Sequence, residues 1–399
     1  MFMKKFLWLA VICLAVVSCR PSAVTLQQEG WAPRVRGALD CLLAECGKSS
    51  PDYDASVRPY AVFDFDNTTI INDIAQTLLV YQIENRRFAI APEDFYTVLT
   101  ESLPDLDIDF GHGLTPRMLA EDLARDYAFL CTCTDLEEMR SSGQYLDFRA
   151  KLWYYSSSTD MAYPDSPFGC VWIISMLEGM TRDEVKTLTR ESVDYWMAQP
   201  CMWRERWESP DGNVSVTVPK GLAFTPEMKE LYTALSRSGI DVYICSASFE
   251  TIVEAVACDP QYGLGLDDSQ VFGIRVAPAA DEYFKAVADS SYAQPYRGGK
   301  VECILSQMAP SHGGRGPVLV AGDSNGDYAM LTQFPDLKVG LIIECLRGGD
   351  IGSLADAARN DTSEVSLSGR TTPLYVVQGR DPGTKTFISI DRSLPVKTK

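Results

Sequence analysis

Two carboxylates, Asp64 and Asp66, stand one residue apart directly after the apolar run Tyr60–Phe63. The run predicts a strand, and acids just past a strand's carboxyl end suit the site edge of an α/β sheet. A carboxylate kept ionised by a metal can attack a phosphoryl group. A second carboxyl two positions on can protonate the leaving oxygen and later activate water. We therefore predict Asp64 as nucleophile and Asp66 as general acid and base.

Three further features follow in chain order and supply the rest of that chemistry. Ser246 ends an apolar run, Lys300 opens a helical pattern, and Asp323 and Asp327 follow another apolar run. Charge on a transferring phosphoryl group needs hydroxyl and ammonium donors. Mg²⁺ needs hard oxygen ligands, which carboxylates at neighbouring strand ends supply. Together the features predict one Mg²⁺-dependent site for a small-molecule phosphate ester.

This ordered set resembles the motifs of the haloacid dehalogenase (HAD) superfamily over about residues 59–75 and 218–350. The matching residues are two Asp followed by Thr, then a Ser, a Lys and an acidic motif: Asp64, Asp66, Thr68, Ser246, Lys300, Asp323 and Asp327. The resemblance implies phosphate contacts for Thr68, Ser246 and Lys300. It implies metal ligation by Asp64, by the Asp66 carbonyl and by Asp323, with Asp327 in support. Ser248 is interpreted as a helix cap rather than a ligand.

The family's fold is expected around these motifs. Alternating strand and helix patterns predict an α/β protein with a doubly wound, mostly parallel, Rossmann-like HAD core. We expect this core at residues 59–75 and 216–399, after a tether and helix at 20–58. Residues 76–215 show helical spacing and almost no strand pattern, and are expected to form an inserted helical cap. The cap and the segments around Ser246 look closest to the phosphoserine and phosphorylcholine phosphatase branch.

The cap is rich in aromatic residues, which leaves the substrate open. The rings either form the cap's core or surround a cation such as choline through cation–π attraction. Candidates for such a box lie outside the clearest helical patterns, with Glu205 and Glu208 nearby: Trp153, Tyr155, Trp203 and Trp207. Phosphorylcholine or another amino-alcohol phosphate, phosphoserine and other phosphomonoesters all remain possible substrates. A degenerate HAD fold used as a ligand- or protein-binding module is the alternative, although no acid of the motifs is missing.

The N-terminal residues 1–19 predict a lipoprotein signal peptide. Lys4 and Lys5 precede the apolar run Phe6–Val17, and small residues before Cys19 resemble the bacterial lipobox. This implies cleavage before Cys19, lipidation of its thiol, and an exported protein anchored to a membrane. A cleaved signal peptide or short anchor with an incidental Cys is the alternative. The net charge of −18 disfavours nucleic acid as a partner.

Overall fold

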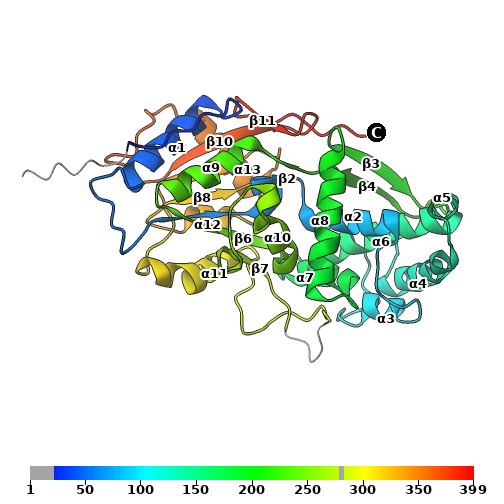
Figure 1. The fold of residues 1–399 in the computed structure, drawn as a ribbon. Coiled ribbons are helices and arrows are strands. Elements are labelled where there is room, and N and C mark those ends of the chain that lie inside the picture. The colour runs from blue at the N-terminus through cyan, green and yellow to red at the C-terminus, as the bar shows by residue number, and fades with distance from the viewer. Residues whose placement is uncertain (1–21, 278–282) are drawn as a thin grey trace, which may run out of the picture.

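The structure is a computed structural model that describes residues 22–277 and 283–399. The predicted signal segment and Cys19 lie outside the described residues. Figure 1 shows a central sheet flanked by helices, beside a second region that is mostly helical. Within the described residues, none of the helices combines the length and hydrophobicity that a membrane span requires.

The central sheet has seven strands in the order β11-β10-β9-β8-β1-β6-β7. In chain order these are β1 (Tyr60–Phe63), β6 (Asp241–Phe249), β7 (Val271–Ile274), β8 (Leu319–Gly322), β9 (Val339–Ile343), β10 (Leu374–Asp381) and β11 (Thr386–Ile388). All neighbours pair in parallel except β10 and β11. The predicted α/β fold with a mostly parallel sheet is therefore confirmed.

Alternate residues of β1 enter two separate hydrophobic clusters, so both faces of the sheet are covered. Ala61 and Phe63 belong to the cluster that includes α1 (Pro33–Cys46), α9 (Pro226–Arg237) and α10 (Glu250–Ala257). Tyr60 and Val62 belong to the cluster of α11 (Gly299–Cys303), α12 (Tyr328–Thr332) and α13 (Gly349–Asn360). Burial on both faces explains why the strands read as continuous apolar runs.

The insertion lies between two short strands, β2 (Ile70–Ile71) and β5 (Ala223–Phe224), which pair antiparallel. Its helices are α2 (Ile74–Asn85), α3 (Phe95–Thr100), α4 (Pro116–Thr132), α5 (Leu136–Ser141), α6 (Gly143–Ala162), α7 (Phe168–Trp172) and α8 (Arg182–Ala198). A capping box formed by Thr181 and Glu184 starts α8. The helical character expected for this region is thus present.

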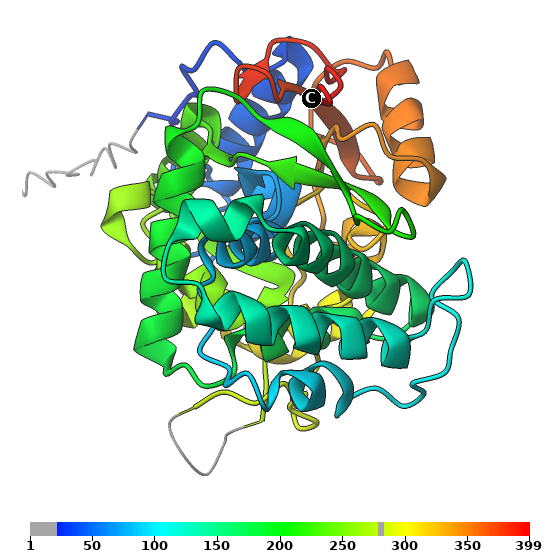
Figure 2. The same cartoon turned by 90° about the vertical axis from the view of Figure 1, so that its right-hand side faces the viewer.

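One hairpin departs from the expected absence of strands in the insertion. β3 (Trp203–Glu208) pairs antiparallel with β4 (Ser215–Lys220) and packs on α6 (Figure 2). Gly212 has a φ of 74°, which a glycine adopts without strain, in the turn between them. The hairpin crosses residue 216, where we placed the cap boundary, so the division into core and cap stays a prediction.

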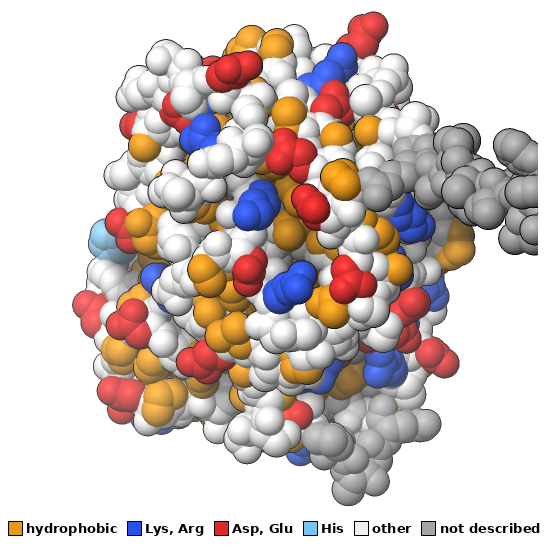
Figure 3. Space-filling view, turned by 90° about the vertical axis from the view of Figure 1, so that its left-hand side faces the viewer, with side chains coloured by type: hydrophobic (Ala, Val, Ile, Leu, Met, Phe, Trp, Pro, Cys, Tyr) orange, Lys and Arg blue, Asp and Glu red, His pale blue; other side chains and the backbone are white. Residues whose placement is uncertain are grey.

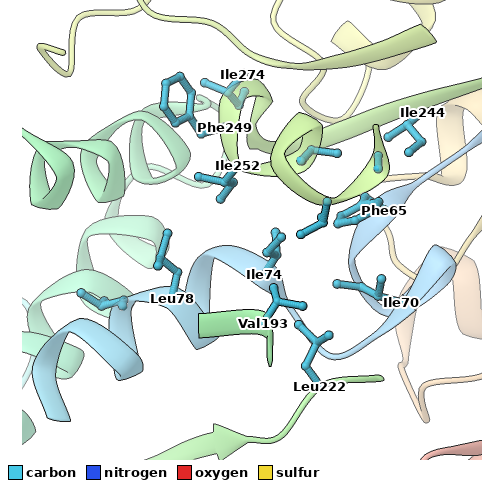
Figure 4. Close-up of a cluster of buried hydrophobic side chains, with 14 of the residues drawn as sticks. Phe65, Ile70, Ile74, Leu78, Val193, Leu222, Ile244, Phe249, Ile252 and Ile274 are labelled. Atoms are coloured by element: carbon cyan, nitrogen blue, oxygen red, sulfur yellow. The ribbon is translucent and has the colours of Figure 1, made fainter. Parts of the chain in front are cut away.

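Buried apolar side chains join the core to the insertion. Figure 4 shows them drawn from the loop after β1, from α2 and α8 of the insertion, and from β6, β7 and α10 of the core; labelled members include Phe65, Ile74, Leu78, Val193, Ile244 and Ile252. Glu254 of α10, 4% exposed, also forms ion pairs with Arg182 and Lys186 of α8. These contacts fix the inserted helices next to the carboxyl ends of the strands, where the predicted site lies.

The net charge of −18 does not produce a single acidic field on every face. On the face shown in Figure 3, Asp and Glu side chains are interspersed with Lys and Arg. An anionic ligand therefore depends on local cations rather than on the field of the whole protein.

Candidate active site

Asp64 begins the loop that follows the central strand β1. Its N–H donates to the Ala321 carbonyl of β8 at 2.9 Å, which holds the residue at the carboxyl end of the central strands. The residue is 6% exposed, and its carboxylate accepts a hydrogen bond from the Thr68 hydroxyl at 3.2 Å. Thr69 donates to the Asp64 carbonyl at 2.7 Å. The loop thus returns to bind the residue from which it starts.

Asp66 lies two residues further along the loop, held by two donors. The Ile74 N–H donates to its Oδ1 at 2.7 Å, and the Ser248 hydroxyl donates to its Oδ2 at 2.6 Å. Burial raises its pKa well above the ordinary value, and the charges of Asp73 and Asp64 raise it further. A carboxyl with a raised pKa can carry a proton at neutral pH, as a general acid requires.

Lys300 joins two acids that are far apart in sequence. Its Nζ donates to Asp64 Oδ1 at 2.7 Å and to Asp327 Oδ1 at 2.6 Å, and the residue is 2% exposed. Burial alone would lower its pKa, but the carboxylates of Asp327 and Asp64 raise it overall. The side chain is therefore a fixed ammonium between the two carboxylates.

Asp323 and Asp327 lie in the turn after β8, the strand next to β1. Asp327 Oδ2 accepts hydrogen bonds from the N–H groups of Asp323 at 3.1 Å and Ser324 at 3.0 Å. The turn needs Gly322, because a Cβ at that position would lie 2.5 Å from the Asp327 Cβ. The sequence Gly322–Asp327 therefore folds back so that both acids lie beside Asp64.

The three acids form a set that fits a metal ion. Asp64, Asp323 and Asp327 each offer one carboxylate oxygen, and these oxygens lie within 4.8 Å of one another. Burial raises the pKa of Asp64 to about 8, with a further contribution from Asp327, and burial also raises the pKa of Asp323. This buried charge is only partly neutralised by Lys300, and hard oxygen donors are those that Mg²⁺ prefers. The donor set therefore suits Mg²⁺.

A cavity of about 520 Å³ connects these residues to the insertion. Its core side is lined by Asp64, Asp66, Ser248, Lys300, Asp323, Asp327 and Arg347. Its other side is lined by residues of α6 and α7, including Trp153, Ser157, Asp160, Gly169 and Cys170. The insertion thus covers the acids and bounds the space that a substrate would occupy.

Ser246 and Ser248 lie differently from what the sequence suggested. Ser246 is 0% exposed, does not line the cavity, and its Oγ accepts the Ser248 N–H at 3.1 Å. Ser248 lines the cavity and does not cap α10, whose first turn has no side-chain cap. The register of β6 against β7 shifts between Cys245 and Phe249, the segment that carries both serines.

Sequence reasoning missed Arg347, which follows β9. Its Nε donates to Asp323 Oδ2 at 2.8 Å, and its side chain lines the cavity. The rule that sites gather at the carboxyl ends of parallel strands could have found it, because β9 is the neighbour of β8. Asp73 and Asp160 also line the cavity and were not singled out.

The four aromatic candidates do not form one box. Trp153 lines the cavity, but the Tyr155 hydroxyl donates to the Leu99 carbonyl inside the insertion at 3.0 Å. Trp207 is 0% exposed and lies 5.3 Å from Lys220 Nζ, while Trp203 lies 4.4 Å from Lys399 Nζ. These two rings already hold cations of the protein itself. Glu205 pairs with Lys220, so it is not available to a ligand at the cavity.

Comparisons with known proteins bear on the class of activity and on the fold. No family model matches the chain. It is similar to a phosphorylcholine phosphatase of Pseudomonas aeruginosa, 26% identical over 266 residues, which are 67% of this chain and 60% of that protein. The matched part therefore spans about 60% of the curated relative's length.

Solved structures give the fold. A conserved protein of unknown function from Anaerococcus prevotii matches with a TM-score of 0.80 and 27% identity, over 93% of this chain and 98% of that one. A phospho-aspartyl intermediate analogue of phosphoserine phosphatase matches at 14% identity with a TM-score of 0.31, over 71% of this chain and 86% of that one, too distant to carry an argument. The comparisons give no support to a non-catalytic binding module. The mostly parallel sheet and the likeness to a phosphorylcholine phosphatase bear out the predicted resemblance to a HAD-type phosphatase.

Proposed function

We propose that this protein is a Mg²⁺-dependent phosphomonoester hydrolase that acts through an aspartyl phosphate at Asp64. One observation carries the proposal: the Asp64 carboxylate, the Lys300 ammonium and the acids Asp323 and Asp327 converge at one end of a ligand-sized cavity. They come from three separate segments of the chain, which makes a chance surface cluster a poor explanation.

The chemistry follows from the positions of the two acids of the first motif. An Asp64 oxygen would attack phosphorus, and the bond from phosphorus to the ester oxygen would break. Asp66, whose pKa is raised by burial, would give its proton to that leaving oxygen. It would then take a proton from the water that hydrolyses the aspartyl phosphate, which regenerates both acids. Lys300 would keep the Asp64 carboxylate oriented and partly neutralised throughout.

Asp64, Asp323 and Asp327 would hold Mg²⁺, which supplies positive charge beside the phosphoryl oxygens when bound. Without that charge, the acids would repel a dianionic ester. The fit rests on the convergence and burial of their carboxylate oxygens.

Phosphorylcholine or another small amino-alcohol phosphate is the substrate class that we favour. Trp153 and Asp160 line the cavity from α6. Trp153 lies four residues before Ser157 and Asp160 lies three residues after it, so the three side chains share one face of the helix. An indole ring and a carboxylate together attract a quaternary ammonium group. The likeness to a phosphorylcholine phosphatase supports this choice.

Hydrolysis is tested with Asp64→Asn. We expect phosphate release from phosphorylcholine and from p-nitrophenyl phosphate to fall about a thousandfold or more, because the amide is not a nucleophile. EDTA should remove wild-type activity and Mg²⁺ should restore it. Asp52→Asn, a change at an exposed acid outside the cavity, is the matched control. Turnover of Asp64→Asn within tenfold of the wild type would contradict the nucleophile assignment.

We also propose that the protein is exported and anchored through a lipid on Cys19, as the lipobox-like sequence suggests. Wild-type protein expressed in a bacterium should incorporate radiolabelled palmitate and sediment with membranes. Cys19→Ala should do neither. Equal labelling of both proteins would rule out Cys19 as the lipidation site.

A further inference from the structure

The donors expected to bind the phosphoryl group are already engaged by the protein. Lys300, 2% exposed, directs two hydrogen bonds to Asp64 and Asp327. Ser246 is fully buried outside the cavity lining, and the Thr68 hydroxyl donates to Asp64. An ammonium has three donors, so Lys300 retains at most one for a ligand. A phosphoryl group with three oxygens needs further partners.

The charge of the cavity makes the same demand. Three cationic side chains line it: Lys300, Arg297 and Arg347. Six acidic side chains line it as well: Asp64, Asp66, Asp73, Asp160, Asp323 and Asp327. A phosphate dianion entering this space meets an excess of negative charge. A bound Mg²⁺ offsets part of it, and a cation that reaches the ligand directly would offset more.

Arg347 has the position and the support that such a cation needs. Its side chain is 44% exposed and lines the cavity, and its Nε is anchored on Asp323 at 2.8 Å. An arginine guanidinium is not deprotonated in proteins, so the side chain brings a positive charge to the cavity. The preceding residue, Leu346, adopts a φ of 58° and donates its N–H to the Glu344 carboxylate at 2.7 Å. The loop after β9 is therefore held in one conformation.

A guanidinium has five N–H donors in a planar fork, and the bond to Asp323 uses one of them. The terminal amino groups of a fork anchored in this way match two oxygens of a phosphate group, a geometry that a lysine cannot reproduce. We infer that Arg347 is a phosphate-binding residue: its terminal amino groups hold phosphoryl oxygens of the ester while Nε keeps Asp323 in place. The ligand class rests on the proposed function.

The test measures binding of inorganic phosphate by isothermal titration calorimetry at saturating Mg²⁺. Arg347→Gln should raise the phosphate dissociation constant at least about tenfold, because it removes one or two charge-assisted hydrogen bonds. Arg347→Lys should recover part of the affinity, because it restores a point charge without the fork. Arg206→Gln is the matched control, since Arg206 is exposed, pairs with Glu208 and lies outside the cavity lining. It should change the constant less than threefold.

A role limited to holding Asp323 predicts a different result. Arg347→Gln would then change the Mg²⁺ dissociation constant and leave the phosphate constant within twofold at saturating Mg²⁺, which would overturn the inference. Wild-type protein that does not bind phosphate would overturn it as well. Wild-type protein that binds phosphate through Arg347 yet hydrolyses no ester would uphold the inference and refute the proposed function alone. Thermal unfolding of both Arg347 variants checks that they are folded.

Discussion

Trp153→Ala is the most direct test of the end of the cavity that we assign to a cation. Trp153 is the member of the aromatic set that lines the cavity, and it shares one face of α6 with Asp160. If the ring contacts the ammonium group of the substrate, its removal should weaken a charged ester more than a neutral ester of the same shape. If the ring only supports the fold, both esters should be affected equally.

The size of the effect follows from the burial of the ring. Trp153 is 8% exposed, so a cation against it would be largely desolvated. A desolvated cation–π contact is worth about 2 kcal/mol, which is roughly a thirtyfold change in relative kcat/KM. The same truncation removes a large buried side chain, which costs about 3 to 5 kcal/mol of stability. The stability loss must therefore be separated from the change in substrate preference.

Trp207→Ala provides that separation. Trp207 is 0% exposed and lies outside the cavity lining, so its truncation should cost similar stability without touching the substrate. The assay compares kcat/KM for phosphorylcholine with that for 3,3-dimethylbutyl phosphate, in which carbon replaces the quaternary nitrogen. We expect the ratio to fall up to about thirtyfold in Trp153→Ala and to stay within twofold in Trp207→Ala. A wild-type enzyme without preference for the charged ester, or equal losses in the two mutants, would refute the reasoning.

Two predictions concern stability. Lys300→Met leaves Asp64 and Asp327 buried without their shared cation. The free energy of unfolding, measured with urea in the absence of Mg²⁺, should therefore be about 3 to 5 kcal/mol lower than in the wild type. An unchanged free energy of unfolding would show that the ion pairs are not needed for stability. Burial, together with Asp147, raises the pKa of Asp126 from 3.8 to about 7. The folded protein binds the proton of Asp126 more tightly than the unfolded chain does. The stability that this proton contributes is therefore fully present below pH 3.8 and is lost as the pH rises to about 7. The loss is at most about 4 kcal/mol. Asp126→Asn should lack this loss, and parallel curves of unfolding free energy against pH for the two proteins would contradict it.

The parts of the site that could be predicted from the sequence are those set by local pattern and sheet topology. Asp64 follows a fully apolar run, and Asp323 follows another. Because these runs become neighbouring parallel strands, their carboxyl ends meet at one edge of the sheet. Lys300 lies at a helix start that packs beside the same edge, and it contacts Asp64 directly. Chain order and strand ends were sufficient to bring these residues together.

The remaining features depend on packing between segments that are far apart in sequence. Ser246 and Ser248 lie where the pairing of β6 with β7 is irregular, and no local pattern indicates which of the two lines the cavity. The roles of Trp203 and Trp207 depend on a hairpin and on Lys399 and Lys220, which supply their cations. Composition alone gives the number of rings but cannot say which of them already have a partner within the protein.

The two sides of the cavity bear on different aspects of the proposed reaction. The acids and Lys300 at the strand ends would act on any phosphomonoester, so selection among the open substrates must come from α6 and α7. A primary ammonium, as in phosphoserine, loses strong hydration on entry and needs hydrogen-bond acceptors in exchange. A quaternary ammonium has no N–H donors, and the indole of Trp153 with the nearby charge of Asp160 is sufficient to hold it. Phosphoserine also brings a carboxylate toward Asp160, where like charges repel. For these reasons we propose a choline ester over an amino-acid ester as the substrate, and the comparison of charged and neutral esters described above tests it.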